Sequence, residues 1–286
     1  MRPFALSQPQ SLSEATGLLA ADGVRPVAGG TAVMLMMKTG VFQPDRLVSL
    51  RGLGPEFSQI SIGNDGFLRI GAMATLRQLE QSADVSRAAP VVASAMQRLA
   101  NIRVRNVATV GGTLAHADPH LDLPPILIAL DARLTMAGPA GKRTLAVENL
   151  FRGYLETALE NGELITQVAI PPQGARSSVY LKHTTRSADD WPALGIAASV
   201  QIENGSVSDI RVAIGAATDT PRRLPGVEAT LSGKPLDAAS IARAADTAAS
   251  EAELRSDARG SAPYKRELVR VFMRRALERI ANGGQV

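Results

Sequence analysis

Cysteine is absent from this 286-residue chain, and aromatic residues make up only 3% of it. Without cysteine, the chain can form neither disulfides nor Cys-ligated iron–sulfur clusters. Its three histidines, His116, His120 and His183, form no cluster with other soft ligands, so a transition-metal site is not expected. Any redox chemistry must therefore depend on a bound organic cofactor or on a partner chain.

Long hydrophobic runs are also missing. No stretch of about 18 uncharged apolar residues occurs, so no membrane span is expected. Residues 1–7 lack an apolar stretch of signal-peptide length, which favours a cytoplasmic protein. The net charge of +4 is modest, and the basic residues are scattered apart from the C-terminal segment. Nucleic acid is not an expected partner, because it requires a basic stripe with stacking aromatics.

The chain does contain enough apolar residues for a core: 45% are hydrophobic, and most of these are Ala, Leu, Val and Ile. Its length allows two domains. In the first 170 residues, short apolar runs predict strands at 24–28, 46–50, 67–71, 132–136 and 165–170. Ser11 and Glu14 fit a capping box that predicts the start of a helix. A helix or turn is predicted through 34–38, and a further helix at about 90–100.

A boundary is predicted at Pro171–Gly174, because two prolines and a glycine end regular structure. Beyond it, Asn204-Gly205 lies between two strand-like runs and predicts a tight β-hairpin, since both residues tolerate positive φ. The alanine-rich stretch after Asp237 and the segment 263–280 are predicted to be helical. The order of these elements indicates an α+β fold in two or three units.

Two glycine-rich turns are the strongest functional signal, at Ala28–Thr31 and Thr109–Thr113. A Gly-Gly turn after a strand frees backbone amides for an anion, usually a pyrophosphate, and the missing Cβ allows its close approach. Each turn alone is also explained as a plain tight turn. Neither turn has the GxGxxG spacing of a Rossmann dinucleotide-binding fold or the GK[ST] sequence of a P-loop. The two turns could grip one diphosphate from both sides, but their spacing leaves open whether they meet.

A family resemblance adds to this interpretation. The segments VAGGTAVMLMMK (27–38) and ATVGGTLAHADPHLDLPPILIALDA (108–132) resemble the paired FAD-pyrophosphate loops of the medium subunit of molybdenum hydroxylases. This family includes carbon monoxide, xanthine, nicotine and caffeine dehydrogenases. The resemblance covers nearly the whole chain, including YLKHTTR (180–186) and DDWP (189–192).

The resemblance implies which residues contact FAD. The expected set is Ala28, Gly29, Gly30, Thr31 and Ala32 around the pyrophosphate, Thr109, Gly111, Gly112 and Thr113 completing the clamp, His116, Asp118 and Asp122 along the following loop, and Ile165 and Lys182 near the flavin or the adenine half. Asp122 matches the carboxylate that binds a ribose hydroxyl, and charge-assisted hydrogen bonds of this kind are strong. Many relatives have Asn or Ser at the position of Thr113. Thr113 keeps a hydrogen-bond donor there but adds a methyl group.

Several of these residues have simpler explanations that the sequence leaves open. His116 could be a polar loop residue, and Asp122 could cap a helix. Lys182 could belong to a solvated strand face. Arg103 and Arg105, just before the second turn, could neutralise phosphate or could be rim charges for a partner chain.

The fold implied by the resemblance is α+β. A two-lobed FAD-binding domain of the PCMH (vanillyl-alcohol-oxidase-like) type is expected at 1–172, with lobes at about 1–55 and 56–172. A C-terminal domain of antiparallel sheet plus helices, of the carbon monoxide dehydrogenase flavoprotein type, is expected at 173–286.

The implied function is electron transfer within a heterotrimer that pairs into a dimer of heterotrimers. A large partner would hold molybdopterin, and a small partner would hold 2Fe–2S clusters. Electrons would pass from the clusters to FAD on this chain and then to an external acceptor, with no catalytic side chain here. The alternatives are a stand-alone FAD-dependent oxidoreductase and a non-redox assembly protein that kept the fold. The first lacks a distinctive base, and the intact Gly-Gly pairs and Asp122 argue against the second.

Overall fold

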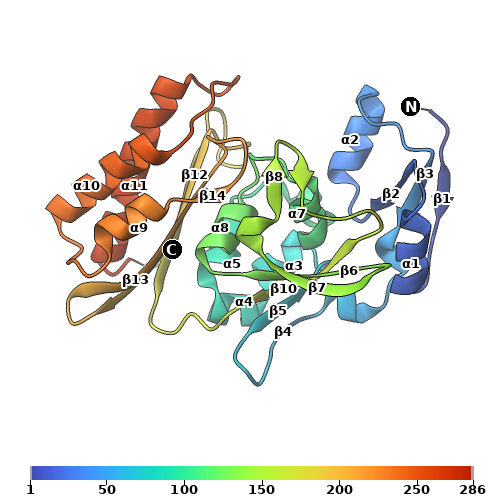
Figure 1. Ribbon diagram of the computed structural model, residues 1–286, viewed down its shortest axis with the longest axis horizontal. Coiled ribbons are helices and arrows are strands. Elements are labelled where there is room, and N and C mark those ends of the chain that lie inside the picture. The colour runs from blue at the N-terminus through green and yellow to red at the C-terminus, as the bar shows by residue number, and fades with distance from the viewer. Residues whose placement is uncertain (1, 285–286) are drawn as a thin grey trace.

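Three of the four sheets follow one another along the long axis of the molecule, in the order of the chain (Figure 1). The structure is a computed structural model that describes residues 2–284. Among these residues, no helix is both long and apolar enough to cross a bilayer. The mixture of helices with a separate antiparallel C-terminal sheet agrees with the expected α+β class.

The first lobe is a small parallel sheet with two helices. Its strands, in spatial order, are β1 (Ala5–Ser7), β3 (Arg46–Ser49) and β2 (Val24–Val27), and its helices are α1 (Leu12–Leu19) and α2 (Thr31–Thr39). Ser11 caps α1 as predicted, by accepting from the Glu14 amide at 3.2 Å. The Glu14 carboxylate accepts from the amide of Gln10 instead of Ser11, so the reciprocal bond of the capping box falls one residue earlier than predicted.

The second lobe is a five-stranded antiparallel sheet covered by short helices. Its strands, in spatial order, are β4 (Ile60–Ile62), β5 (Leu68–Gly71), β10 (Leu164–Ile170), β6 (Arg133–Gly138) and β7 (Gly141–Ala146). Its helices are α3 (Leu76–Gln81), α4 (Ala83–Ala88), α5 (Pro90–Gln97), α6 (Ile102–Arg105), α7 (Val110–His116) and α8 (Leu123–Ala129). A two-stranded ribbon, β8 (Phe151–Gly153) with β9 (Glu156–Thr157), follows β7.

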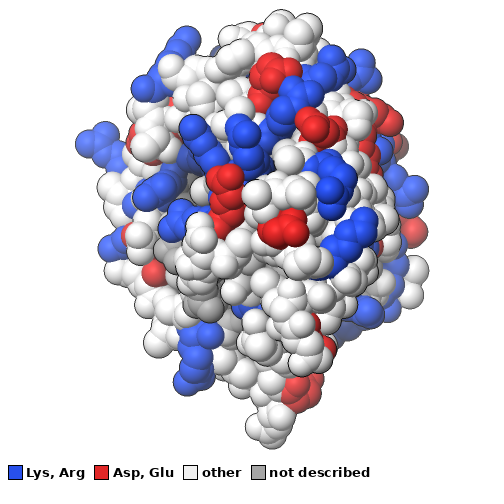
Figure 2. All heavy atoms as spheres, turned by 90° about the vertical axis from the view of Figure 1, so that its left-hand side faces the viewer, with Lys and Arg blue, Asp and Glu red and all other residues white. Residues whose placement is uncertain are grey.

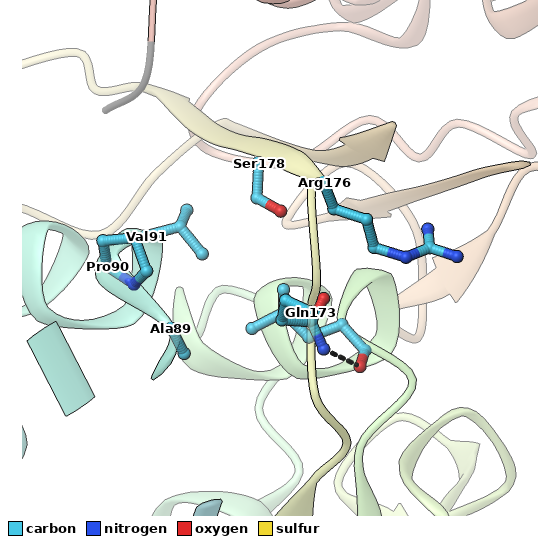
Figure 3. A pocket seen from close by; sticks show the side chains of 7 residues that line it. Ala89, Pro90, Val91, Gln173, Arg176 and Ser178 are labelled. Carbon is cyan, nitrogen blue, oxygen red and sulfur yellow. Dashed lines mark hydrogen bonds between the residues drawn. The ribbon is translucent and has the colours of Figure 1, made fainter. Parts of the chain in front are cut away.

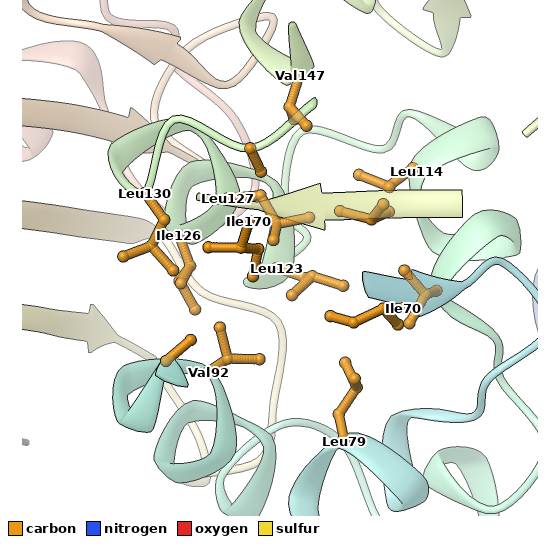
Figure 4. Close-up of a cluster of buried hydrophobic side chains, with 14 of the residues drawn as sticks. Ile70, Leu79, Val92, Leu114, Leu123, Ile126, Leu127, Leu130, Val147 and Ile170 are labelled. Atoms are coloured by element: carbon orange, nitrogen blue, oxygen red, sulfur yellow. The ribbon is translucent and has the colours of Figure 1, made fainter. Parts of the chain in front are cut away.

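The largest hydrophobic core lies between this sheet and its helices (Figure 4). All seven residues of α8 are buried, because the helix is apolar on every side. It packs against β12 (Leu194–Glu203) and β13 (Ser206–Gly215) of the next sheet as well as against its own lobe. Helix α8 therefore joins the second lobe to the C-terminal domain, and its first residues lie where the two meet.

The C-terminal domain is a four-stranded antiparallel sheet backed by helices. Its strands follow in spatial order as β11 (Ser177–His183), β12 (Leu194–Glu203), β13 (Ser206–Gly215) and β14 (Arg222–Arg223), and its helices are α9 (Pro225–Leu231), α10 (Ala238–Glu251) and α11 (Ala262–Ala281). The predicted hairpin is confirmed: Asn204 and Gly205 turn between β12 and β13 with φ of 50° and 78°. Small alanines such as Ala244 and Ala248, both fully buried, let α10 pack closely.

Charged side chains of both signs are scattered among uncharged residues on the outer face of this domain (Figure 2). Arginines on the helices pair with acidic neighbours: Arg270 contacts Asp246 at 2.7 Å and Glu267 at 2.5 Å. Acidic groups therefore interrupt the basic character of α11 at Arg270.

Candidate functional site

The two glycine-rich turns lie against each other, which the spacing in the sequence had left open. A Cβ on Gly29 would lie 2.7 Å from the carbonyl carbon of Val107 and 2.9 Å from Cα of Ala108, just before the second turn. A Cβ on Gly112 would lie 3.9 Å from Cβ of Ala28. The backbone of the first turn therefore packs directly on the second, and this contact requires glycine at position 29.

The first turn exposes backbone donors. Strand β2 ends at Val27, and Gly30 caps α2 with a φ of 77°, a conformation that glycine adopts without strain. Within residues 2–284, the amides of 31–33 donate to no protein acceptor, and the first bond of the helix runs from Met34 N–H to the Gly30 carbonyl at 3.0 Å. Three free N–H groups at the positive end of a helix dipole form a place for an anion.

The second turn has the same Gly-Gly-Thr sequence but no free donors. The first four amides of α7 all have protein acceptors. Those of residues 110 and 111 donate to the carbonyls of Ala74 and Ala72 at 2.9 and 2.7 Å, and those of 112 and 113 donate to the hydroxyl and carbonyl of Thr109 at 3.1 and 2.9 Å. This turn can therefore contribute shape to an anion site, but in this conformation it contributes no backbone hydrogen bond.

The two glycines of the second turn have different surroundings. Gly111 is buried on β5, and a Cβ there would lie 2.7 Å from Cβ of Ala72. Gly112 is exposed, and a Cβ there would meet only the Thr109 hydroxyl, at 2.8 Å, and Ala28. Gly111 is thus needed for packing, whereas Gly112 presents open backbone surface beside the first turn.

The loop after α7 turns inward. Ala117 ends the helix with a φ of 53°. Asp118 is only 9% exposed and accepts from both the amide and Nδ1 of His120, at 2.9 and 3.0 Å. His116 is the last residue of α7, not a loop residue, and it is half-buried; burial lowers the pKa of its imidazole, and the nearby Asp118 charge opposes this.

Asp122 is the most deeply placed carboxylate of the expected set, at 5% exposure. It occupies the cap position of α8 but makes no capping hydrogen bond, so the capping interpretation is wrong. Its oxygens instead accept from the Tyr180 hydroxyl at 2.7 Å and from Lys182 Nζ at 3.4 Å, both on β11. Burial raises the pKa of Asp122, although Lys182 and Tyr180 oppose it, and burial also holds the pKa of Tyr180 well above its ordinary value.

The side chains of Lys182 and Ile165 are both largely buried. The Lys182 side chain is 10% exposed and also donates to the carbonyl of Asp190 at 3.3 Å, so it does not lie on a solvated strand face. Ile165 lies on β10, paired with Met136, and is 8% exposed within the core of the second lobe. Little of the Ile165 side chain is therefore reachable from outside.

The two arginines before the second turn differ. Arg105 is buried, pairs with Glu80 at 2.9 Å and donates to the carbonyls of Leu99 and Ala100, so its proposed roles in phosphate neutralisation or at a partner rim are wrong. Arg103 is exposed, and the structure leaves both roles open for it.

Sequence reasoning missed the C-terminal partners of this site. Tyr180 lies in a segment that carried the resemblance, but no role was assigned to it. His120 contacts Asp257 at 3.2 Å, and 137 residues separate the two in the chain. No local pattern could have indicated this contact.

A small cavity in the described part of the chain lies elsewhere (Figure 3). Its volume is about 30 Å³, enough for one or two water molecules, and it is lined by Ala89, Pro90, Val91, Leu130, Gln173, Arg176 and Ser178. A wider groove of about 280 Å³ is lined by Glu148, Asn149, Arg222, Arg223, Leu224, Pro225 and Glu251. Neither includes a residue of the glycine turns, so the donors of α2 and the exposed Gly112 remain the best-defined place for a diphosphate.

Comparison with known families agrees with this geometry. Residues 2–173 match the family described as the FAD binding domain in molybdopterin dehydrogenase. Residues 179–280 match the family described as the CO dehydrogenase flavoprotein C-terminal domain.

Relatives match this chain over almost its whole length. The carbon monoxide dehydrogenase medium chain of Hydrogenophaga pseudoflava is 32% identical, with 96% of each chain covered. The glyceraldehyde dehydrogenase medium chain of Sulfolobus acidocaldarius is 30% identical, with 97% of this chain and 98% of the relative covered. Among solved structures, a chain of the Hydrogenophaga pseudoflava carbon monoxide dehydrogenase superposes with a TM-score of 0.93 at 33% identity, covering 97% of this chain and 98% of that chain. A chain of quinoline 2-oxidoreductase from Pseudomonas putida 86 gives a TM-score of 0.92 at 29% identity, covering 100% and 99%.

Proposed function

Because this chain belongs to the FAD-binding subunits of the molybdenum hydroxylase family, we propose that it carries electrons within a heterotrimer, from an iron–sulfur subunit to an external acceptor. Membership establishes an FAD-binding oxidoreductase subunit with an FAD-binding domain and a C-terminal domain of sheet and helices. We place the division between the domains at 172/173 and that between the lobes near 55/56.

The free amides of α2 are the observation that carries the cofactor site. We propose that the N–H groups of Thr31 and Ala32 hold the FAD pyrophosphate, and that Ala28, Gly29 and Gly30 shape the approach to it. Three unsatisfied donors at a helix N-terminus favour a doubly charged diphosphate, and the positive dipole adds to the attraction. When bound, FAD supplies the ability to accept and release electrons, while the chain binds and orients it.

The second turn and its loop complete the proposed site. Thr109 and Gly111 hold the turn in place, the open surface of Gly112 admits the diphosphate, and the Thr113 hydroxyl is the donor nearest to it in sequence. Packing of Gly29 on Val107 keeps the two turns together.

The remaining proposed contacts come from the loop after α7 and from β11. We propose that Asp122 accepts a ribose hydroxyl in addition to Tyr180 and Lys182, because a carboxylate has about four acceptor positions. His116, Asp118, Lys182 and Ile165 are proposed to line the cofactor nearby.

The partners follow from the chemistry that this chain lacks. With no cysteine this chain holds no Cys-ligated cluster, so any iron–sulfur cluster that supplies its electrons must lie on another subunit. The relatives' names, medium chain and FAD-binding subunit, describe one component of a larger enzyme. We propose a large molybdopterin subunit, a small subunit with 2Fe–2S clusters, and pairing into a dimer of heterotrimers.

The test is an absorbance spectrum of the chain after incubation with FAD and removal of the excess. We expect stoichiometric flavin bands, and weaker retention for Asp122→Asn. The matched control is Asp131→Asn, which breaks the 3.0 Å ion pair with Arg211 just beyond the other end of α8. Absence of flavin both from the chain alone and from the co-purified complex would favour the assembly-protein alternative. Reduction of the flavin by an organic substrate without partners would favour the stand-alone enzyme.

A further inference from the structure

The loop at 117–122 carries Asp118 and Asp122, yet the C-terminal domain holds it in place. The carbonyl of Pro119 accepts from the Ala216 amide at the end of β13, at 2.8 Å. Asp122 is bonded to two side chains of β11, and His120 reaches the segment before α11. Three separate parts of the C-terminal domain therefore fix a loop of the FAD-binding domain.

A line of four charged or ionisable side chains makes the longest of these links. His120 places Nδ1 3.0 Å from Asp118 and Nε2 3.2 Å from Oδ2 of Asp257. The same Asp257 oxygen accepts from Lys265 Nζ at 2.7 Å, and Lys265 is 0% exposed. We refer to Asp118, His120, Asp257 and Lys265 as the His120 relay.

The hydrogen-bond pattern of the relay favours a doubly protonated His120. A neutral imidazole has one N–H, so one of its two carboxylate contacts would lack a proton, whereas an imidazolium donates to both. With the imidazolium, two positive charges balance two carboxylates. Burial works to raise the pKa of Asp257, but hydrogen bonds from Lys265, the Arg259 amide and His120 outweigh it, and the pKa lies below its ordinary value.

His120 also lies beside Trp191, which Arg259 contacts in turn. The Trp191 ring lies 6.0 Å from the imidazole between ring centroids, and the Arg259 guanidinium lies 5.8 Å above Trp191. Arg259 also donates from Nε to the Trp191 carbonyl at 3.3 Å. Loss of the His120 proton would therefore leave a mostly buried cluster with one excess negative charge and one carboxylate contact without a donor.

We propose that His120, Asp257 and Lys265 are positioning residues that hold the loop at 117–122 in its FAD-binding conformation, so that the C-terminal domain, through the protonation of His120, controls how long FAD is retained. This inference rests on the proposed cofactor site of the two glycine turns and their loop. Deprotonation of His120 removes one link of the relay, the loop loosens, and FAD leaves faster.

The test compares FAD dissociation from the full-length chain with that from His120→Gln between about pH 5 and pH 8, the range in which histidine side chains generally change charge. For the wild type we expect dissociation to accelerate as pH rises. His120→Gln carries no positive charge at any pH, so it should release FAD roughly tenfold faster at the acid end and lose most of the pH dependence of the wild type. The control, His183→Gln, removes a histidine of the C-terminal domain whose Nε2 meets the Tyr264 hydroxyl at 3.1 Å, and it should behave like the wild type.

A second measurement does not depend on FAD. In the apoprotein, hydrogen exchange of the amides at 117–122 reports the order of the loop, and the His120 amide donates to Asp118 at 2.9 Å. We expect faster exchange there in His120→Gln and no change in His183→Gln. If exchange and FAD release in His120→Gln both match the wild type, the inference is overturned. If the wild type retains no FAD alone or in its complex, the proposed function fails, and the exchange data alone decide whether the relay orders the loop.

Discussion

The turns at 29–31 and 111–113 share the sequence Gly-Gly-Thr and lie against each other, yet the backbone amides that follow them differ in whether they donate to a protein acceptor. The first leaves three helix amides without a protein acceptor, whereas the second uses all four of its first amides internally. A glycine-rich turn is therefore not a binding site by sequence alone. Its role depends on which acceptors the rest of the fold brings to it.

The cause lies in what each turn packs on. The second turn packs on the end of β5, where the carbonyls of Ala72 and Ala74 accept hydrogen bonds from two of its amides. The hydroxyl and carbonyl of Thr109 accept from two more. The first turn follows β2, an outer strand of a three-stranded sheet, and its residues are half-buried or exposed. One turn is part of the scaffold, and the other is left open for a ligand.

The contact between the turns is the feature most easily broken. Gly29→Ala would place a Cβ inside contact distance of the backbone at Val107 and Ala108, which cannot move aside like a flexible side chain. We expect the free energy of unfolding to fall by about 3 kcal/mol, the upper end of the range for overpacking, and FAD retention to be lost. Chemical denaturation and flavin absorbance measure the two effects.

The neighbouring glycine is the control for this change. A Cβ on Gly30 would meet only Met34 Cγ, at 3.4 Å, and Val27 Cγ2, at 3.6 Å. The φ of 77° still disfavours alanine, so Gly30→Ala should cost about 1 kcal/mol. Equal stabilities for Gly29→Ala and the wild type would contradict the packing of one turn on the other.

Removing one amide from each helix tests the comparison directly. Val110→Pro removes an amide that donates to Ala74 at 2.9 Å, so a buried carbonyl loses its partner and stability should fall by about 2 kcal/mol. Ala32→Pro removes a free amide in the first turn of α2, where proline is tolerated, as Pro124 and Pro125 in α8 show. Its stability should change by less than about 1 kcal/mol, while FAD affinity should fall roughly tenfold or more.

These two variants should therefore show opposite patterns. Denaturant titration gives stability, and fluorescence titration with FAD gives affinity. If Val110→Pro weakened FAD binding strongly while Ala32→Pro did not, the assignment of donors to the first turn would be reversed.

Much of the fold could be predicted from local patterns. The hairpin at Asn204-Gly205 and the last helix were predictable because turn chemistry and helical spacing act within a few residues. Helices α3 and α4 and strand β7 were missed, since each is short and its apolar residues repeat too few times for a period to show. The sequence offered β11 only as a solvated strand face at Lys182. In the structure Val179 faces one core and Tyr180 the other, so no face alternates with solvent.

The candidate site was predictable only in part. The two turns were visible in the sequence, but the use of the second turn's amides depends on Ala72 and Ala74, which pair with it only in the folded chain. The link from His120 to Asp257 spans 137 residues and follows no periodicity. Long-range hydrogen bonds of this kind need the tertiary structure.

A smaller contrast concerns the caps of the two helices. Thr109 caps α7 by accepting from the Gly112 amide at 3.1 Å, whereas Gly30 at the cap of α2 has no side chain. Thr109→Val should lower the free energy of unfolding by about 1 kcal/mol. Thr31→Val, in the exposed first turn of α2, should change it by less than about 0.5 kcal/mol. Thermal unfolding of both variants measures the difference, and equal losses would contradict the distinction between scaffold and open turn.

The smallest expected effect concerns the far ends of the same helices. Helix α2 ends at the exposed Thr39, which is followed by the exposed Gly40. Helix α7 ends at the half-buried His116, and burial lowers the pKa of its imidazole against the opposing Asp118 charge. Because the folded pKa lies below the ordinary value of 6.5, the unfolded chain binds the proton more readily. The contribution of His116 to stability is therefore complete above about pH 6.5 and is lost as the pH falls through the folded pKa.

His116→Gln should remove this dependence. Relative to the wild type, the variant should become more stable by less than about 1 kcal/mol as the pH is lowered from about 8 to about 5. His183→Gln should show no such change. Urea denaturation at several pH values measures this difference without requiring FAD. A parallel loss of stability in wild type and His116→Gln would show that the end of α7 is as open to solvent as the end of α2, and the contrast between the two helices would then be confined to their N-termini.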